Sequence, residues 1–206
     1  MKYDAVVVAY GLGKRSGLKT NKVLFKMKNG KTVLENSCHL FIEDKDCNKV
    51  VVVTKGKVSF SSPKVVIVPG GKRRCDSVYM GLQEVESKYV LIHDGVRPYL
   101  SKTDLEKLKK SIAKNEGAIL AHSAVETVKC VEKGTVKRTI NRDKIYCAMT
   151  PQAFKTDLIK KAYDKVDLND TTDDASIFEK ANYKVRIVEG SRKNIKLTNK
   201  EDFENI

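Results

Sequence analysis

Short apolar runs alternate with amphipathic helical patterns along almost the whole sequence. The apolar runs predict strands at 4–9, 49–54, 64–68, 89–93, 117–121 and 183–188. Helical periodicity falls at 32–42, 74–85, 103–114, 155–163, 172–180 and 200–204, with Ser101 or Thr103 and Thr172 expected as N-caps. Strands that are joined by helices and buried on both faces form mainly parallel sheets. The sequence therefore predicts an α/β fold, with helices flanking the sheet, in one domain of 206 residues.

One segment, 125–149, breaks this pattern. Polar and apolar residues alternate in it around Lys133 and Gly134, which predicts a β-hairpin. A two-stranded arm buries too little surface to be stable alone, so the arm, at about 124–149, is expected to pack on a second copy of the chain. The sequence thus predicts a homodimer.

A glycine-rich loop follows the first strand and reads A-Y-G-L-G-K-R-S-G-L-K-T-N-K at 9–22. Gly11, Gly13 and Gly17 permit tight turns that point backbone N–H groups at an anion, and Arg15 and Lys22 add positive charge. The loop matches neither a P-loop nor a dinucleotide-binding fingerprint. It predicts a polyphosphate site, and the alternative is a flexible basic surface loop.

Two further strand ends carry chemistry, and in an open α/β sheet the carboxyl ends of the strands form the ligand site. After the third strand, Gly70 and Gly71 allow a close backbone approach, and Ser77 lies in the first turn of a helix whose N-terminus favours anions. After the fourth strand come Asp94 and Arg97. A carboxylate beside a polyphosphate suits Mg²⁺, so Asp94 is a candidate metal ligand; alternatively, it only caps a turn.

The formal net charge of +14 requires nucleic acid to be considered as a partner. The sequence has no Trp, its lysines are scattered, and many fall on the polar faces of predicted helices, among them Lys107, Lys109, Lys110, Lys160 and Lys161. Solvated surface is therefore the better interpretation of the charge. The five cysteines form no C-x-x-C pair, and no apolar stretch is long enough for a membrane span, which together predict a cytoplasmic protein with reduced thiols.

Several longer motifs occur in order along nearly the whole chain. They are G-x-G-x-R with Lys22 downstream, G-G-x-x-R-x-x-S-V at 70–78, H-D-x-x-R-P at 93–98, E-T-V-K at 126–129, N-R-x-x-x-x-x-A-x-T-P-Q at 141–152, T-D-D-A-S at 172–176 and N-I-K-L-T at 194–198. Each motif alone is weak to moderate, but together they are hard to obtain by chance. The sequence resembles the 2-C-methyl-D-erythritol 4-phosphate cytidylyltransferases of the non-mevalonate isoprenoid pathway.

This resemblance implies a Rossmann-like nucleotidyltransferase fold with a projecting β-hairpin dimerisation arm. It also implies a Mg²⁺-dependent reaction in which CTP and the sugar-alcohol phosphate give a CDP-linked alcohol and pyrophosphate. The implied catalytic residues are Arg15, Lys22, Arg142 and Lys196; the nucleotide-binding residues are Tyr10, Gly11, Gly13, Gly71, Arg74 and Ser77; the substrate-binding residues are Asp94, Arg97, Thr127, Arg142, Thr150, Thr172 and Lys196. Thr127 and Arg142 would come from the arm of the second copy.

Two other functions stay open. The first is a ribitol- or glycerol-phosphate cytidylyltransferase of cell-wall polymer synthesis, which shares the fold, the arm and the mechanism. Separately, Tyr10 stands where the family has a small residue, and its ring can stack on a base or change which base fits. A non-catalytic nucleic-acid-binding protein on a degenerate transferase scaffold is expected to lack Arg15, Lys22 or Asp94, and this sequence has all three.

Overall fold

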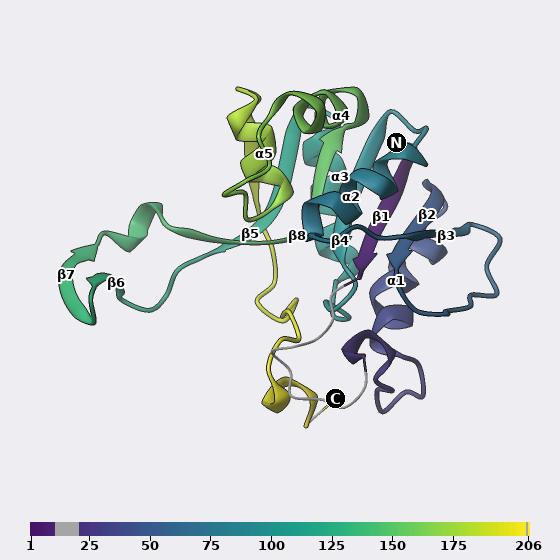
Figure 1. Cartoon of the computed structure of the whole chain (residues 1–206), viewed down its shortest axis with the longest axis horizontal. Helices are drawn as coiled ribbons and strands as arrows, with labels where there is room; N and C mark the ends of the chain where they lie inside the picture. The colour runs from purple at the N-terminus through teal and green to yellow at the C-terminus, as the bar shows by residue number, and fades with distance from the viewer. Residues whose placement is uncertain (11–20, 205) are drawn as a thin grey trace.

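The computed structural model describes residues 1–10, 21–204 and 206. Within these residues a seven-stranded sheet has the order β3-β2-β1-β4-β8-β5-β9 (Figure 1). Its strands are β1 (Tyr3–Ala9), β2 (Cys47–Thr54), β3 (Val65–Pro69), β4 (Tyr89–Asp94), β5 (Gly117–Ser123), β8 (Tyr146–Lys155) and β9 (Val185–Glu189). Only β8 runs antiparallel to its neighbours β4 and β5; the other described pairs in this sheet are parallel. The predicted mainly parallel sheet is confirmed.

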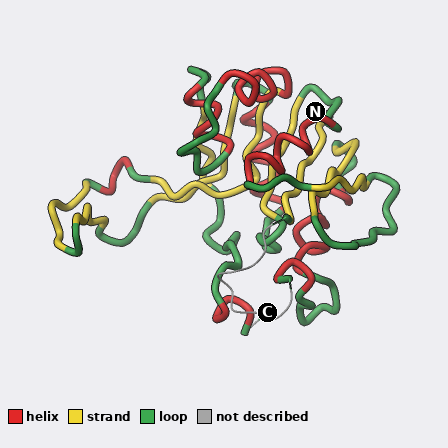
Figure 2. Tube along the Cα trace, viewed as in Figure 1, coloured by secondary structure: helices red, strands yellow, loops and turns green. Residues whose placement is uncertain are grey.

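Helices cover both faces of the sheet (Figure 2). One apolar cluster packs α1 (Val33–Glu43) and α3 (Lys102–Ile112) on one face, and a second packs α2 (Arg74–Gln83), α4 (Thr156–Lys165) and α5 (Asp174–Lys180) on the other. Strand β1 shows how the sequence builds both clusters: Ala5 and Val7 belong to the first and Val6 to the second. Because alternate side chains of a strand point to opposite faces, one apolar run fills two cores.

Helix ends follow local hydrogen-bonding rules, with two corrections to the sequence-based expectation. Ser101 caps α3 by accepting from the Asp104 N–H, which confirms the first of the two N-cap candidates there. Thr172 is not the N-cap of α5; Asp173 is, because its carboxylate accepts from the Ser176 N–H at 2.9 Å. The helical pattern predicted at 200–204 is the short 3-10 turn η3 (Lys200–Phe203) rather than an α-helix.

Strand β8 was not expected, because the sequence predicts an arm up to residue 149 and a helix from 155. Pro151 argues against a central strand at this position, since proline cannot donate a hydrogen bond to a neighbouring strand. The register shows how the sheet accommodates it. Ala121 faces Ala148 and Ile119 faces Gln152, so residues 149–151 bulge opposite a single residue of β5.

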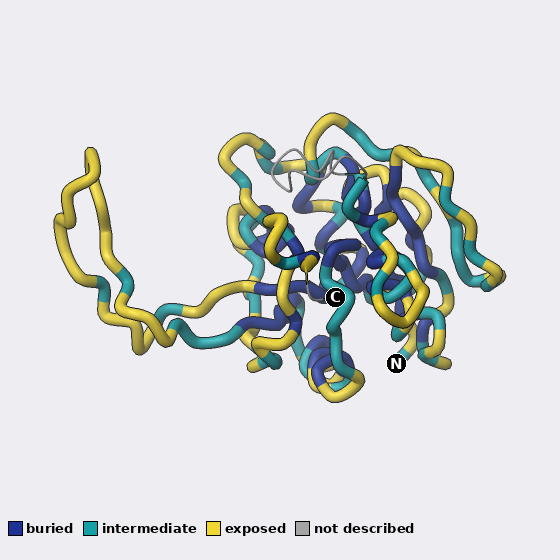
Figure 3. Tube along the Cα trace, turned by 90° about the horizontal axis from the view of Figure 1, so that it is seen from below, coloured by how far each residue is buried: buried dark blue, intermediate teal, exposed yellow. Residues whose placement is uncertain are grey.

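The predicted hairpin forms and projects from the body of the molecule (Figure 1). Strands β6 (Val128–Glu132) and β7 (Thr135–Ile140) pair antiparallel, and Lys133 and Gly134 make the turn with φ angles of 48° and 78°. The arm lies almost wholly at the surface (Figure 3), with Val131 and Val136 each 55% exposed. Its apolar side chains therefore have little cover within one chain.

Lys109 is a correction to the solvated surface that the helical pattern predicts. It is only 6% exposed, and its Nζ lies 2.8 Å from Asp44 Oδ2, 2.7 Å from Asp46 Oδ2 and 2.9 Å from Glu106 Oε1. The Tyr3 hydroxyl donates to the same oxygen of Asp44 at 2.9 Å. This lysine staple, as we call these five residues, joins β1, α3 and the connection between α1 and β2.

All five cysteines are unpaired. Among the residues that the structure describes, no helix has the length and apolar character that a bilayer crossing requires.

Candidate active site

The strand order reverses direction at β1. The chain runs from β1 outward through β2 and β3 and then returns to place β4 on the other side of β1. Such a switch point leaves a crevice at the carboxyl ends of the two central strands, where α/β proteins bind ligands. Val8 of β1 pairs with Asp94 of β4, and Tyr10 follows directly after β1. The fold thus brings the first loop and the H-D-x-x-R-P segment to one place.

Asp94 is surrounded by cations from three segments. Arg74 Nε lies 3.1 Å from Asp94 Oδ1, while Lys196 Nζ lies 2.8 Å and Arg97 Nε 3.7 Å from Oδ2. Arg74 also reaches Asp174, with Nη2 2.8 Å from Oδ2. The three cations and two carboxylates of this group, which we call the Asp94 cluster, sum to one positive charge.

The Asp94 cluster keeps its charges. Burial alone would raise the pKa of Asp94, but the Arg74 guanidinium, followed by the Lys196 ammonium, holds that pKa well below its usual range. Burial lowers the pKa of Arg97 in spite of the opposing effect of Asp94, yet a guanidinium still stays protonated. Asp94 is therefore an ionised acceptor that is held in place by fixed positive groups.

His93 supports Asp94 from within the core. The Thr150 Oγ1 lies 3.0 Å from His93 Nδ1 and accepts the Asp94 N–H, also at 3.0 Å, while His93 Nε2 lies 3.1 Å from the Arg97 carbonyl oxygen. Because a carbonyl only accepts, Nε2 carries the proton, and the Thr150 hydroxyl donates to Nδ1. Burial lowers the pKa of His93 to about 4, so the ring is neutral at physiological pH. His93 is therefore a buried, neutral residue that is bonded to the backbone of Arg97.

Asn194 connects three of the predicted site residues. Its Nδ2 donates to the Thr150 backbone carbonyl oxygen at 2.8 Å, and its own backbone carbonyl oxygen accepts from Arg97 Nη1 at 2.7 Å. Asn194 is fully buried and lies two residues before Lys196. It therefore ties the segment that carries Lys196 to Thr150 and Arg97.

Lys22 lies beside the same segment. It opens the short 3-10 turn η1 (Lys22–Leu24), whose N-cap is Asn21, and its Nζ is 3.4 Å from the Leu197 carbonyl oxygen. Leu197 in turn donates its N–H to Val96 in the turn after β4, at 2.9 Å. Lys22 and Lys196 thus approach the crevice from neighbouring backbone.

The loop after β3 closes against the start of α2, as the two glycines predict. A Cβ added to Gly70 would come within 2.3 Å of the Tyr10 ring, and one added to Gly71 within 2.4 Å of Asp76. Ser77 is fully buried; its hydroxyl accepts from the Gly71 N–H at 3.1 Å and donates to the carbonyl of the α2 N-cap residue at 3.0 Å. Ser77 therefore shapes the loop backbone, and Tyr10 packs directly on Gly70.

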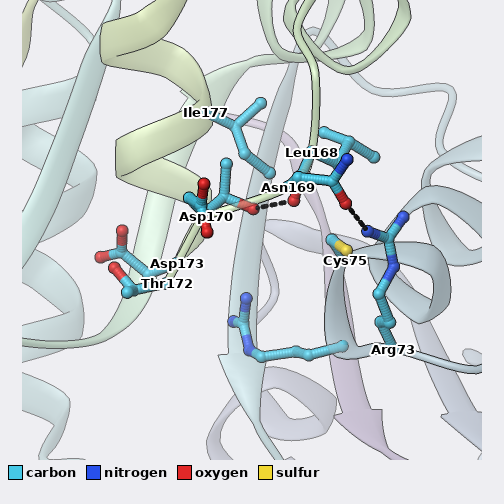
Figure 4. A pocket seen from close by; sticks show the side chains of 10 residues that line it. Arg73, Cys75, Leu168, Asn169, Asp170, Thr172, Asp173 and Ile177 are labelled. Atoms are coloured by element: carbon cyan, nitrogen blue, oxygen red, sulfur yellow. Dashed lines mark hydrogen bonds between the residues drawn. The ribbon is translucent and has the colours of Figure 1, made fainter.

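A pocket of about 250 Å³ opens between the start of α2 and the segment 168–173 (Figure 4). It brings together Arg74 and Thr172, which the sequence places 98 positions apart. Arg73 Nη1 donates to Asn169 Oδ1 at 3.2 Å across one side of it. The exposed Thr172 thus lines the same pocket as Arg74, whose guanidinium holds Asp94.

The predicted residues of the arm do not meet the Asp94 cluster in one chain. Thr127 and Arg142 are exposed on the projecting arm, where Arg142 Nη1 donates to the Val125 carbonyl oxygen. Gly11, Gly13 and Arg15 lie outside the described residues.

Sequence reasoning missed three residues that the structure adds to the site. Asn194 belongs to a quoted motif but was assigned no role. Asp174 pairs with Arg74, and the Tyr163 hydroxyl donates to Asp174 at 2.6 Å. The T-D-D-A-S motif contains Asp174, whereas no local signal points to Tyr163.

The residues around Asp94 do not fit a bound divalent cation in this arrangement. Both carboxylate oxygens already lie within 3.1 Å of a cationic nitrogen, from Arg74 and Lys196, and a metal ion there would be repelled. The described part of the chain also has no group of three or more His, Cys, Asp or Glu side chains that could hold a metal.

Comparison with known proteins gives one family. The sequence model of the 2-C-methyl-D-erythritol 4-phosphate cytidylyltransferase family matches residues 3–205. Enzymes of that name from Shouchella clausii and Petrotoga mobilis are each 39% identical, over 98% and 97% of this chain and 94% of their own lengths. The crystal structure of the Francisella tularensis enzyme of that name superposes with a TM-score of 0.85 at 33% identity, covering 98% of this chain and 96% of that one. The chain therefore belongs to the 2-C-methyl-D-erythritol 4-phosphate cytidylyltransferase family.

Proposed function

We propose that this chain transfers a cytidylyl group from CTP to 2-C-methyl-D-erythritol 4-phosphate. A phosphate oxygen of the sugar alcohol attacks the α-phosphorus of CTP, the bond from that phosphorus to the bridging oxygen of the pyrophosphate breaks, and pyrophosphate leaves. The product is 4-diphosphocytidyl-2-C-methyl-D-erythritol. The observation that carries this proposal is an ionised Asp94 held among Arg74, Arg97 and Lys196 at the switch point, in a chain of this family.

The chemistry agrees with this arrangement. Attack of one phosphate on another requires alignment of two anions and fixed positive charge, with little covalent help from the protein. We assign the neutralisation of the transition state to Arg15, Lys22, Arg142 and Lys196. The nucleotide is assigned to Tyr10, Gly11, Gly13, Gly71, Arg74 and Ser77, and the sugar phosphate to Asp94, Arg97, Thr127, Arg142, Thr150, Thr172 and Lys196. In this assignment Asp94 accepts a hydrogen bond from a hydroxyl group of the sugar alcohol, because its carboxylate is ionised.

Ser77 and Thr150 act in this proposal through the backbone that they hold. Both are buried, and both hydroxyls already donate within the protein. Ser77 keeps the Gly71 N–H in place, and Thr150 keeps Asp94 in place.

Nucleotidyltransferases generally use a divalent cation, and Mg²⁺ is the proposed one here. Since the arrangement around Asp94 does not fit such an ion, no step of the proposed reaction is assigned to a metal held there.

Pyrophosphate release tests the function. Purified protein is incubated with CTP, Mg²⁺ and 2-C-methyl-D-erythritol 4-phosphate, and a parallel reaction contains ribitol 5-phosphate instead. We expect release with the erythritol phosphate and little with the ribitol phosphate. Release only with ribitol phosphate would move the protein to polymer synthesis. No pyrophosphate release with either substrate, together with RNA binding that persists at physiological salt, would support the nucleic-acid alternative.

We also propose that the arm docks on a second copy of the chain. Val125, Val131, Val136 and Tyr146 on and beside the arm are 45–55% exposed, and a lone two-stranded arm gains little stability by itself. A symmetric dimer would bury these side chains and carry Thr127 and Arg142 to the other copy's site.

Arg142→Ala is expected to raise the KM for the sugar phosphate by about 10-fold or more, because an interaction with one phosphate group is lost, while the KM for CTP changes little. Arg138→Ala is the matched control, since Arg138 is an exposed arginine of the same arm. Steady-state kinetics with each substrate varied in turn measures both constants. Equal loss of affinity for both substrates would argue against a sugar-phosphate contact from the arm.

A further inference from the structure

Three consecutive hydrogen bonds connect helix α4 to the carboxylate of Asp94. The Tyr163 hydroxyl donates to Asp174 Oδ1 at 2.6 Å, Arg74 Nη2 donates to Asp174 Oδ2 at 2.8 Å, and Arg74 Nε donates to Asp94 Oδ1 at 3.1 Å. This series of hydrogen bonds connects four elements: α4, α5, α2 and β4. It approaches Asp94 from the face of the sheet opposite to α1 and α3, since Tyr163 belongs to the second apolar cluster.

Because a guanidinium is rigid, this series of hydrogen bonds determines how Arg74 meets Asp94. Its five N–H donors lie in one rigid plane, so a contact that fixes Nη2 also fixes where Nε points. Without Asp174, Arg74 would be free to turn and grip both oxygens of Asp94 in a bidentate pair, the geometry that arginine and carboxylate prefer. With Asp174 present, Arg74 occupies Oδ1, and Oδ2 stays on the side of Arg97 and Lys196.

Asp174 can hold Arg74 in this way because it is a buried, fully hydrogen-bonded carboxylate. It is 0% exposed, so an ionised side chain there requires partners for both oxygens. Arg74 supplies one and Tyr163 the other. Burial, followed by the charge of Asp174, raises the pKa of Tyr163, so its hydroxyl remains a donor at any physiological pH.

We propose that Asp174 and Tyr163 are positioning residues for the transfer reaction, which act by holding Arg74 on Oδ1 of Asp94. Oδ2, which Lys196 already contacts, then keeps a second acceptor position for a hydroxyl of the substrate. This inference rests on the proposed function, because Asp94 is taken to contact the sugar alcohol. Neither residue touches a substrate in this proposal. Their effect on turnover passes through Arg74.

Tyr163→Phe tests the first link, since it removes one hydroxyl and keeps the ring that packs in the core. We expect kcat to fall about 10-fold, the KM for CTP to stay within about twofold, and the protein to remain folded at the assay temperature. The matched control is Tyr183→Phe. Tyr183 packs on Phe178 at a ring-centroid distance of 4.8 Å, and its hydroxyl has no hydrogen bond to the described residues, so its kcat should equal that of the wild type.

A double-mutant cycle separates positioning from general support of the fold. If Tyr163 acts through Arg74, then Tyr163→Phe should lower kcat by less than about twofold once Arg74→Lys has been introduced. An equally large effect in both backgrounds would overturn the proposal, as would a wild-type kcat in Tyr163→Phe alone. These outcomes are separate from failure of the proposed function, which would be seen as absence of pyrophosphate release from the wild-type protein.

Discussion

Lys22→Ala is expected to lower turnover by about 10³-fold, because a fixed cation beside a transferring phosphoryl group in a phosphoryl-transfer enzyme is worth about that factor or more. In the proposed mechanism the Lys22 ammonium serves both anions, because Lys22 is the last residue of the glycine-rich loop and its Nζ is 3.4 Å from the carbonyl oxygen of the residue after Lys196. The fold should survive, since the buried anchor of this turn is Val23 rather than the lysine. Stopped-flow or coupled measurement of pyrophosphate release gives the rate, and circular dichroism gives the fold.

Lys26→Ala is the matched control for this experiment. Lys26 is an exposed lysine four residues further along, and its loss removes the same charge from the protein. Turnover near that of the wild type in Lys22→Ala, or an equal fall in Lys26→Ala, would remove Lys22 from the proposed mechanism. Arg15→Ala carries the same expectation of lost turnover, although Arg15 lies outside the described residues.

The layers of the fold could be predicted because the signals for them are local. A strand made of consecutive apolar residues, such as the run from Ala5 to Val8, has two apolar faces, and both are buried only when helices cover both sides of the sheet. Strand β8 could not be predicted in the same way. Its Pro151 is a local argument against a central strand, and the bulge that admits the proline exists only because β5 lies opposite.

The site residues also fall into those that local sequence signals predict and those that only tertiary contacts bring to the site. Asp94 is the last residue of β4, and Arg97 and Gly71 lie two or three residues beyond the ends of β4 and β3, so their position at the carboxyl edge comes from the alternation of strands and helices. Asp174 and Tyr163 join the site only through tertiary contacts, to Arg74 and to each other, from 100 and 11 positions away. Sequence periodicity contains no information about such pairs, which is why the partners of Arg74 were missed.

Lys109→Met is expected to produce the largest loss of stability, about 3 kcal/mol, because removing one partner of a buried ion pair leaves uncompensated charge. Three carboxylates, from Asp44, Asp46 and Glu106, would then face one another around an apolar side chain. For a chain of this length each kcal/mol corresponds to roughly 2–4 °C in Tm. Lys110→Met is the matched control, since Lys110 is exposed on the same helix, and its Tm should stay near that of the wild type.

The pH dependence of this difference identifies its cause. Burial would raise the pKa of Asp44, but the hydrogen bond from Lys109, followed by that from the Asp46 N–H, lowers it overall. A carboxyl group with a lowered pKa in the folded state stabilises the protein above its unfolded pKa, near 3.9, and that stabilisation is lost as the pH falls further. The wild type should therefore lose stability on acidification below about pH 4 more steeply than Lys109→Met, and the gap between them should narrow. Urea unfolding at pH 7 and at pH 3 measures both gaps. A gap of equal size at the two pH values would mean that Lys109 stabilises the fold through packing of its aliphatic chain rather than through its charge.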